Sequence, residues 1–188
     1  MRSAMRHGIL AAGLFALATL PAGAQAPPVM ADLLADVGET ERKIVGLAKA
    51  IPEPHFAWRP MEGVRSVREV LQHVAADNYL LPAFVGVTVP ASLGINPTDY
   101  ATVQKFEART IDRATAIAEL EASFAHLKKA MEMADASKAG ESVTFFGTTM
   151  TRQRVWVLTT THLHEHLGQL IAYARSNSVV PPWSRGGN

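Results

Sequence analysis

The chain has 188 residues, of which 48% are hydrophobic and 19% are charged, with 18 basic residues, 17 acidic residues and no cysteine. This length and apolar content predict one domain with its own core rather than two. The balanced charge excludes a nucleic-acid-binding surface, because neutralising phosphates requires clustered Lys and Arg and no such cluster is present. Without cysteine, disulfides and thiolate ligands are excluded, so a bound metal must be held by nitrogen or oxygen.

An export signal is predicted at residues 1–24. Arg2 and Arg6 give a basic start, an apolar run follows, and Ala22-Gly23-Ala24 offers the small residues that signal peptidase accepts. Cleavage is expected after Ala24 or after Ala26. The apolar run is shorter than the roughly 20 residues that cross a bilayer, so we expect no stable membrane insertion after cleavage. The protein is therefore predicted to be periplasmic or secreted, and loss of the two arginines changes its net charge from +1 to −1.

The remaining residues, 25–188, form the predicted domain, in which helical periodicity appears in four long stretches. These stretches are residues 30–51, 66–85, 111–136 and 151–176. Segments rich in Pro, Gly and turn residues separate them, and no internal repeat is visible. Four long helices without a strong strand pattern predict an all-α four-helix bundle.

The second predicted helix has a clear start and an interrupted end. Ser66 and Glu69 fit the S-x-x-E capping box, in which each side chain satisfies a free backbone N–H of the first turn. Pro82 lies inside the helical pattern, so we expect it to kink the helix or to end it near Leu81.

Two connections stand out between the helices. Residues 86–109 form a long crossover between helices two and three, in which Pro90, Gly94 and Pro97 break any regular pattern. It is longer than most loops in a compact domain, so we expect it to cross the bundle or to cover a site. Residues 138–147 are predicted to be a turn that contains a short extended piece at residues 142–146.

His162 and His166 stand four residues apart in the predicted fourth helix. At about 100° per residue their side chains differ by about 40° in direction and emerge from one face, so both can bind the same ion. His164 lies about 200° from His162 on the same helix, so it points away from any site that the other two form.

His73 is the histidine of the predicted second helix, and Asp77 follows one turn later. Sites in helix bundles are built from residues that project inward from facing helices, so His73 can complete a site with the pair of helix four. Three protein ligands leave a coordination position open for water or substrate, which is typical of catalytic metal sites. Asp77 is then an outer acceptor for an imidazole N–H, a fourth ligand, or the base that takes a proton from bound water.

Two segments resemble signatures of the DinB family of four-helix metalloenzymes. They are VRSVREVLQHVA at residues 64–75, which follows Trp58-Arg59-Pro60, and HLHEHLGQL at residues 162–170. The resemblance implies the same bundle with a long crossover between helices two and three, a metal triad of one histidine from helix two and the pair from helix four, and frequent dimers. Some relatives use small thiols as cofactors or cosubstrates. Most members are cytoplasmic, so the predicted export signal weakens the inference to thiol chemistry here.

The sequence thus favours an exported enzyme of hydrolase or transferase type that acts on a small molecule at an open site of His73, His162 and His166. Its cofactor would be a divalent ion, and nitrogen ligands accept zinc, nickel, iron, manganese or cobalt. One alternative is a non-catalytic module that binds a metal or ligand, or that only forms a homodimer. Another is a structural bundle without metal, because an H-x-x-x-H pair is common by chance and a single His73 is more often a polar residue at the core margin.

Overall fold

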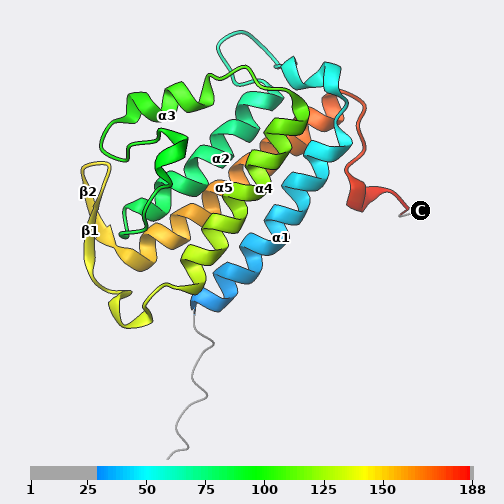
Figure 1. The fold of residues 1–188 in the computed structure, drawn as a ribbon. Coiled ribbons are helices and arrows are strands. Elements are labelled where there is room, and N and C mark those ends of the chain that lie inside the picture. Colours follow the sequence, from blue (N-terminus) through cyan, green and yellow to red (C-terminus); the bar gives the residue numbers. More distant parts are fainter. Residues whose placement is uncertain (1–28, 187–188) are drawn as a thin grey trace, which may run out of the picture.

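Four long helices lie side by side in the computed structural model, which describes residues 29–186 (Figure 1). They are α1 (Val29–Ala50), α2 (Val67–Ala83), α4 (Arg113–Glu132) and α5 (Arg152–Ser176). This arrangement confirms the predicted four-helix bundle. No helix in the described part of the chain is both long and apolar enough to span a bilayer. The predicted export signal lies outside the described residues.

The order of the helices around the bundle differs from their order along the chain. Helix α1 packs against α4 and α5, and α2 packs against the same two helices. Helices α1 and α2 therefore occupy opposite corners, although they follow each other in sequence. As a consequence, α2 lies beside α5, and two segments that are about 90 residues apart in sequence share one interface.

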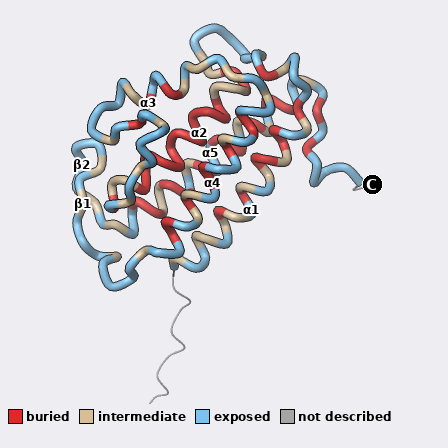
Figure 2. The backbone as a smooth tube through the Cα atoms, viewed as in Figure 1, coloured by how far each residue is buried: buried red, intermediate tan, exposed pale blue. Residues whose placement is uncertain are grey.

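Buried residues are concentrated along these four helices (Figure 2), and they form the main hydrophobic core. Its largest fully buried side chains include Ile44, Leu71, Phe124 and Leu163, one from each long helix. Burying a side chain of this size contributes roughly 1.5–3 kcal/mol. The core thus fixes the relative positions of α2 and α5, which carry the candidate ligands.

The start of α2 is fixed by the predicted capping box. The Glu69 backbone N–H donates to Ser66 Oγ at 3.3 Å, and the Ser66 backbone N–H donates to the Glu69 carboxylate at 2.6 Å. Pro82 lies in the last turn, and the helix ends at Ala83 without a further straight segment. This ending agrees with the prediction, since proline cannot donate to the carbonyl one turn earlier.

The crossover between α2 and α4 contains a helix that the sequence analysis did not predict. Helix α3 (Tyr100–Glu107) is capped by Asp99, whose carboxylate accepts the Ala101 backbone N–H. Its buried residues Val103 and Phe106 pack against α2 in a second apolar cluster. The expectation that residues 86–109 are irregular is therefore wrong over α3. The tertiary contact with α2 stabilises a helix that is too short to form alone.

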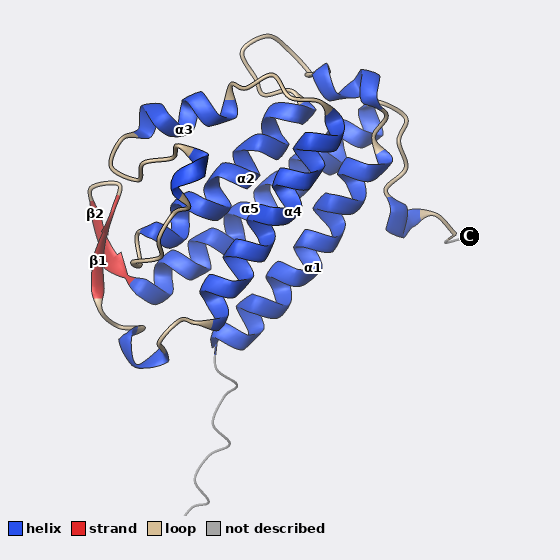
Figure 3. Cartoon of the chain, in the orientation of Figure 1, coloured by secondary structure: helices blue, strands red, loops and turns tan. Residues whose placement is uncertain are grey.

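A two-stranded antiparallel hairpin joins α4 to α5 (Figure 3). It consists of β1 (Ser142–Phe145) and β2 (Thr148–Thr151), with Phe145 paired to Thr148 across the turn. The extended piece that the sequence predicted is thus one strand of a hairpin. Short 3₁₀ turns complete the described chain at Glu53–Ala57, Ala91–Leu93, Ala136–Lys138 and Pro182–Ser184.

The hairpin turn is made by Phe146 and Gly147, and both have positive φ angles, 45° and 79°. Two positive φ angles are typical of a type I′ turn, which matches the twist of a hairpin and favours Asn-Gly. Glycine adopts this backbone freely, whereas a bulky residue such as Phe146 is held there at a cost of about 1–3 kcal/mol. Phe146 therefore occupies a position where Asn would be more stable.

Candidate metal centre

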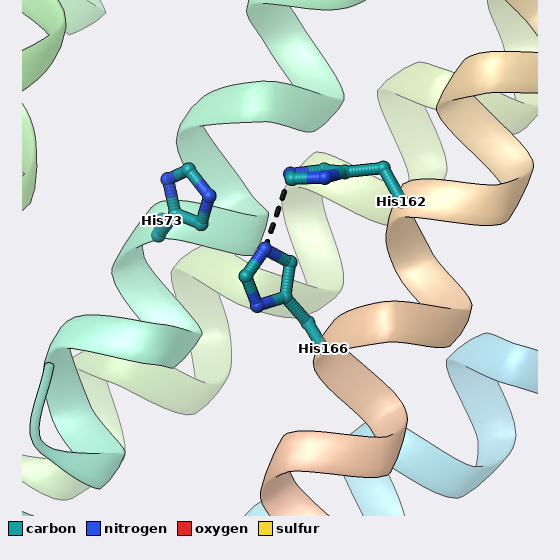
Figure 4. A group of neighbouring side chains, drawn as sticks. All are labelled: His73, His162 and His166. Atoms are coloured by element: carbon teal, nitrogen blue, oxygen red, sulfur yellow. Dashed lines mark hydrogen bonds between the residues drawn. The ribbon is translucent and has the colours of Figure 1, made fainter. Parts of the chain in front are cut away.

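The three predicted ligands meet between α2 and α5. His73 comes from α2, two turns after its cap, while His162 and His166 come from successive turns of α5, and the three rings point toward one another (Figure 4). One nitrogen of each ring lies within 4.8 Å of the corresponding atoms of the other two. The side chain of His73 is only 8% exposed and that of His162 is 26% exposed. The site is thus partly buried and open on one side.

The spacing of the nitrogen atoms fits a single metal ion. His162 Nε2 and His166 Nε2 face each other at 3.2 Å. Two nitrogens bound at 2.0–2.1 Å to one tetrahedral ion would lie roughly 3.3 Å apart. The ring centroid of His73 lies 5.2 Å from that of His162 and 4.6 Å from that of His166, so the third imidazole approaches the same point. These three residues could hold a divalent cation through nitrogen.

Hydrogen bonds hold the outer nitrogens of two of these rings. His73 Nδ1 donates to Glu107 Oε1 at 2.7 Å, and His166 Nδ1 donates to Gln169 Oε1 at 2.9 Å. Donation from Nδ1 selects the tautomer in which Nε2 carries a free lone pair. Both rings therefore present Nε2 to the centre, which is the arrangement that metal-binding histidines commonly have.

A second layer of contacts supports these acceptors. Gln169 Nε2 donates to the Tyr173 hydroxyl at 2.9 Å, and that hydroxyl donates to the Arg65 backbone carbonyl at 3.1 Å. The Arg65 guanidinium in turn donates to Glu107 at 3.1 Å. The acceptors of His73 and His166 are thus linked through one residue just before α2, so the orientation of both rings depends on the same network.

Asp77 lies on the inner side of the site. Its Oδ2 atom is 2.7 Å from His162 Nε2 and 3.4 Å from His73 Nε2. These are nitrogens that face the centre, so Asp77 contacts the candidate ligands directly. Its three predicted roles, outer acceptor, fourth ligand and proton acceptor, stay predictions.

The surroundings shift the pKa values of the two α5 histidines in opposite directions. Burial, together with the neighbouring imidazoles, lowers the pKa of His166 to about 4. Burial also opposes the charging of His162, but the hydrogen bond and negative charge of Asp77 outweigh it and raise the pKa of His162. Glu107 is buried as well, yet its contacts with His73 and Arg65 lower its pKa. His166 is therefore neutral, as a ligand must be, and Glu107 is ionised.

His164 points away from the centre, as predicted. Its Nε2 atom lies 2.8 Å from Asp36 Oδ2 and 3.4 Å from Thr40 Oγ1, both on α1. The helical wheel placed it correctly because only the period of the helix was needed.

Glu107 is the site residue that the sequence analysis missed. It lies at the end of α3, in the segment expected to be irregular, and comes to His73 only because α3 packs on α2. The signal that could have revealed the helix is the capping Asp99 followed by apolar Val103 and Phe106 at helical spacing.

A pocket of about 350 Å³ opens from the centre. His73, Asp77 and His162 line one part of it, and Leu80, Leu158 and Phe146 line another. A larger pocket of about 420 Å³ lies elsewhere, near Met30 and Trp156, and none of the three histidines lines it. The smaller pocket is therefore the one that can bring a molecule to the candidate ligands.

Comparison with known proteins places the chain among similar folds. The family described as the DinB superfamily matches residues 37–170. No curated protein shows significant similarity to the chain.

Solved structures share the fold, and three proteins from Bacillus species are among them. A DinB-like protein from Bacillus cereus ATCC 10987 is 12% identical, with a TM-score of 0.65 over 80% of this chain and 93% of its own. The DinB-like protein YjoA from Bacillus subtilis is 16% identical, with a TM-score of 0.61 over 79% and 93%. YfiT from Bacillus subtilis, described as a probable metal-dependent hydrolase with an unusual four-helix bundle topology, is 14% identical, with a TM-score of 0.65 over 86% and 95%. At these identities the likeness extends to the fold alone.

Proposed function

This chain belongs to the DinB superfamily, and we propose that it is a divalent-metal-dependent enzyme of hydrolase type that acts on a small molecule at His73, His162 and His166. The convergence of three imidazoles, with two Nε2 atoms 3.2 Å apart beside an open pocket, is the observation that carries the proposal. The shared fold of YfiT, which is described as a probable metal-dependent hydrolase, supports hydrolytic chemistry.

The surrounding residues suit this chemistry. A divalent ion held there would polarise a substrate oxygen and lower the pKa of bound water. Glu107 and Gln169 orient the rings of His73 and His166, and so fix where a substrate can react. Asp77 Oδ2 lies 2.7 Å from His162 Nε2, and this distance supports a role for the carboxylate in accepting a proton from a nucleophile at the centre. Leu80 and Leu158 line the adjoining wall and limit the access of water.

Metal content tests the ligand set directly. Protein purified without chelator is expected to contain about one divalent ion per chain by inductively coupled plasma mass spectrometry. His162→Ala and His166→Ala should lose most of that ion while circular dichroism shows the helical fold retained. His164→Ala is the matched control, because it removes a histidine of the same helix that faces α1, and it should keep the ion.

Turnover tests the proposed role of Asp77. On a panel of esters, amides and lactones, Asp77→Asn should reduce kcat by about 10²- to 10⁴-fold if the carboxylate is a general base, with metal content unchanged. Loss of the metal in Asp77→Asn would instead make this residue a fourth ligand. Wild-type protein without a stoichiometric ion would contradict the metal-dependent function, and metal without turnover would favour the non-catalytic module.

A further inference from the structure

The pocket beside the histidines has a polar half and an apolar half. The polar half is formed by His73, Asp77 and His162, and the apolar half by Leu80, Leu158 and the phenylalanines of the hairpin. Leu80 is only 1% exposed and belongs to the second apolar cluster, in which α3 packs on α2, so this part of the wall is held by packing. A molecule that fills the pocket would therefore meet two different surfaces, and its two ends must differ in chemistry.

An aromatic cluster forms the outer edge of the apolar half. The ring centroids of Phe84, Phe145 and Phe146 lie 4.8 Å from one another, and that of Tyr100 lies 6.3 Å from Phe146. These residues come from the end of α2, the hairpin and the start of α3, and the last two elements lie on the same side of the bundle (Figure 1). Rings at these distances stabilise each other and present a firm edge to a ligand.

Phe146 is exposed more than packing alone would require. Its side chain lines the pocket, yet the residue is 55% exposed and has a φ of 45° in the turn. An asparagine there would relieve the backbone and place a polar group in water. A ligand that covers this large, exposed ring would bury its apolar surface, and this burial would contribute to the free energy of binding.

The charges around the pocket are acidic. Its charged lining residues are Asp77 and Glu165, apart from the histidines, and no Lys or Arg belongs to the described lining. Glu107 adds a third carboxylate next to His73, and Arg65 nearby is paired to that carboxylate. The negative charge of these groups would offset the positive charge of a divalent ion. The part of a ligand that lies away from the histidines therefore finds no cation to pair with.

We propose that the substrate of this site carries a flat, uncharged apolar group, such as an aromatic ring, which packs against Phe146 while its reacting group faces His73, His162 and His166. This proposal rests on the proposed function for the position of the reacting group. Phosphate or carboxylate groups on the far part of the molecule are disfavoured, because they would lie against apolar side chains with no Lys or Arg of the pocket lining to pair with.

Three hydroxamic acids that share one metal-binding head test this substrate class on metal-loaded protein. Acetohydroxamic acid carries a methyl group, benzohydroxamic acid a ring, and succinic monohydroxamic acid a carboxylate. Isothermal titration calorimetry should give benzohydroxamic acid a Kd at least about tenfold lower than that of acetohydroxamic acid. Succinic monohydroxamic acid should bind no more tightly than acetohydroxamic acid.

Phe146→Asn isolates the ring, because asparagine suits the turn and should leave the hairpin as stable or more stable. The Kd of benzohydroxamic acid should rise by about 3- to 10-fold, whereas that of acetohydroxamic acid should not change. Met61→Asn removes another exposed apolar side chain away from the pocket and should leave both Kd values unchanged. Phe146→Gly repeats the test with a second residue that tolerates positive φ.

Benzyl alcohol lacks a strong metal-binding group, so its binding tests the aromatic contact without a metal. A failure of this inference can therefore be told apart from a failure of the proposed function. Its saturation-transfer NMR signal on chelator-treated protein should weaken in Phe146→Asn and persist in Met61→Asn. If the protein holds no metal and binds no acetohydroxamic acid, the proposed function fails and benzyl alcohol still decides the inference. Equal binding of benzohydroxamic acid by wild type and Phe146→Asn, or tighter binding of the succinic compound by wild type, would overturn it.

Discussion

Glu107 acts on the centre through the ring of His73. It accepts the Nδ1–H of His73 at 2.7 Å and is itself bound by Arg65 at 3.1 Å. Outer acceptors of this kind fix the ring orientation and raise the basicity of the ligating nitrogen. The affinity of the site for a metal should therefore depend on a residue that lies 34 positions away from His73 in the sequence.

Replacing Glu107 with Gln should weaken metal binding by about 10- to 100-fold, because the amide lacks the negative charge that polarises His73. Competition with a fluorescent chelator measures this change. Glu121→Gln is the matched control, since Glu121 pairs with Lys49 on the surface of α1 and α4 and should leave the affinity unchanged. Equal affinity of Glu107→Gln and wild type would show that the contact does not tune the site.

His126 should make the fold sensitive to acid. Its ring lies 4.8 Å from that of Tyr79, and its Nε2 atom is buried without a hydrogen-bond partner among the described residues. Burial, and then the charge of Lys129, lower the pKa of His126 below its ordinary 6.5. The unfolded chain thus binds a proton more readily than the folded chain, so stability is lost as pH falls below about 6.5.

In His126→Phe the loss of unfolding free energy between about pH 7 and pH 5 should be smaller than in wild type, because the titrating group is gone while the ring stays. Urea unfolding at each pH measures the difference. His164→Gln, at an exposed position, should follow the wild-type curve. If the unfolding free energy of His126→Phe fell with pH as steeply as that of wild type, the burial of His126 would not be the cause of the acid sensitivity.

Among the secondary-structure elements, α2 depends for its stability on the cap at its N-terminus. The Ser66–Glu69 box satisfies two backbone donors of the first turn, and Glu69 also binds Arg59 at 3.1 Å. The helix carries His73 and Asp77, so fraying of its first turns would displace both. Helix α3 and the hairpin depend instead on their packing, since they are short and mostly exposed.

Ser66→Ala should lower the unfolding free energy by about 1 kcal/mol, within the 0.5–2 kcal/mol usual for a lost N-cap. Urea denaturation measures the change. Ser66→Thr keeps a hydroxyl acceptor and should restore most of the stability. If alanine and threonine behaved alike, the capping hydrogen bond would not be the source of the effect.

For the whole molecule, the arrangement of the four helices makes the site possible. Because α1 and α2 occupy opposite corners, α2 shares an interface with α5, and the three histidines form a bridge between them. An ion at this place would bind to both α2 and α5. Along the chain these two helices are connected only through the crossover, α4 and the hairpin. Binding to the folded chain alone stabilises it by mass action.

Chelator should therefore lower the Tm of metal-loaded protein. Removing an ion present at 100 times its Kd costs about 2.7 kcal/mol of stability. Differential scanning calorimetry with and without EDTA measures the shift. The shift should be absent in His162→Ala and present in His164→Ala, and a Tm that does not respond to EDTA in loaded wild type would exclude a structural link through the ion.

The sequence by itself determined what depends on neighbouring residues along the chain. Helical periodicity located the four long helices, Ser66 and Glu69 located the start of α2, and a spacing of four placed His162 and His166 on one face. His164 was excluded by the same rule. These features follow from helix geometry and capping, which act over a few residues. The export signal and the homodimer remain predictions.

Only the tertiary structure decided which distant residues meet. It put His73 beside the pair of α5, turned Asp77 toward the inner nitrogens, and brought Glu107 to His73 through a helix that the sequence analysis had not found. It also set Phe146 at the edge of the pocket. No local pattern contains this information, because the approach of segments far apart in sequence is fixed by how the bundle packs its core.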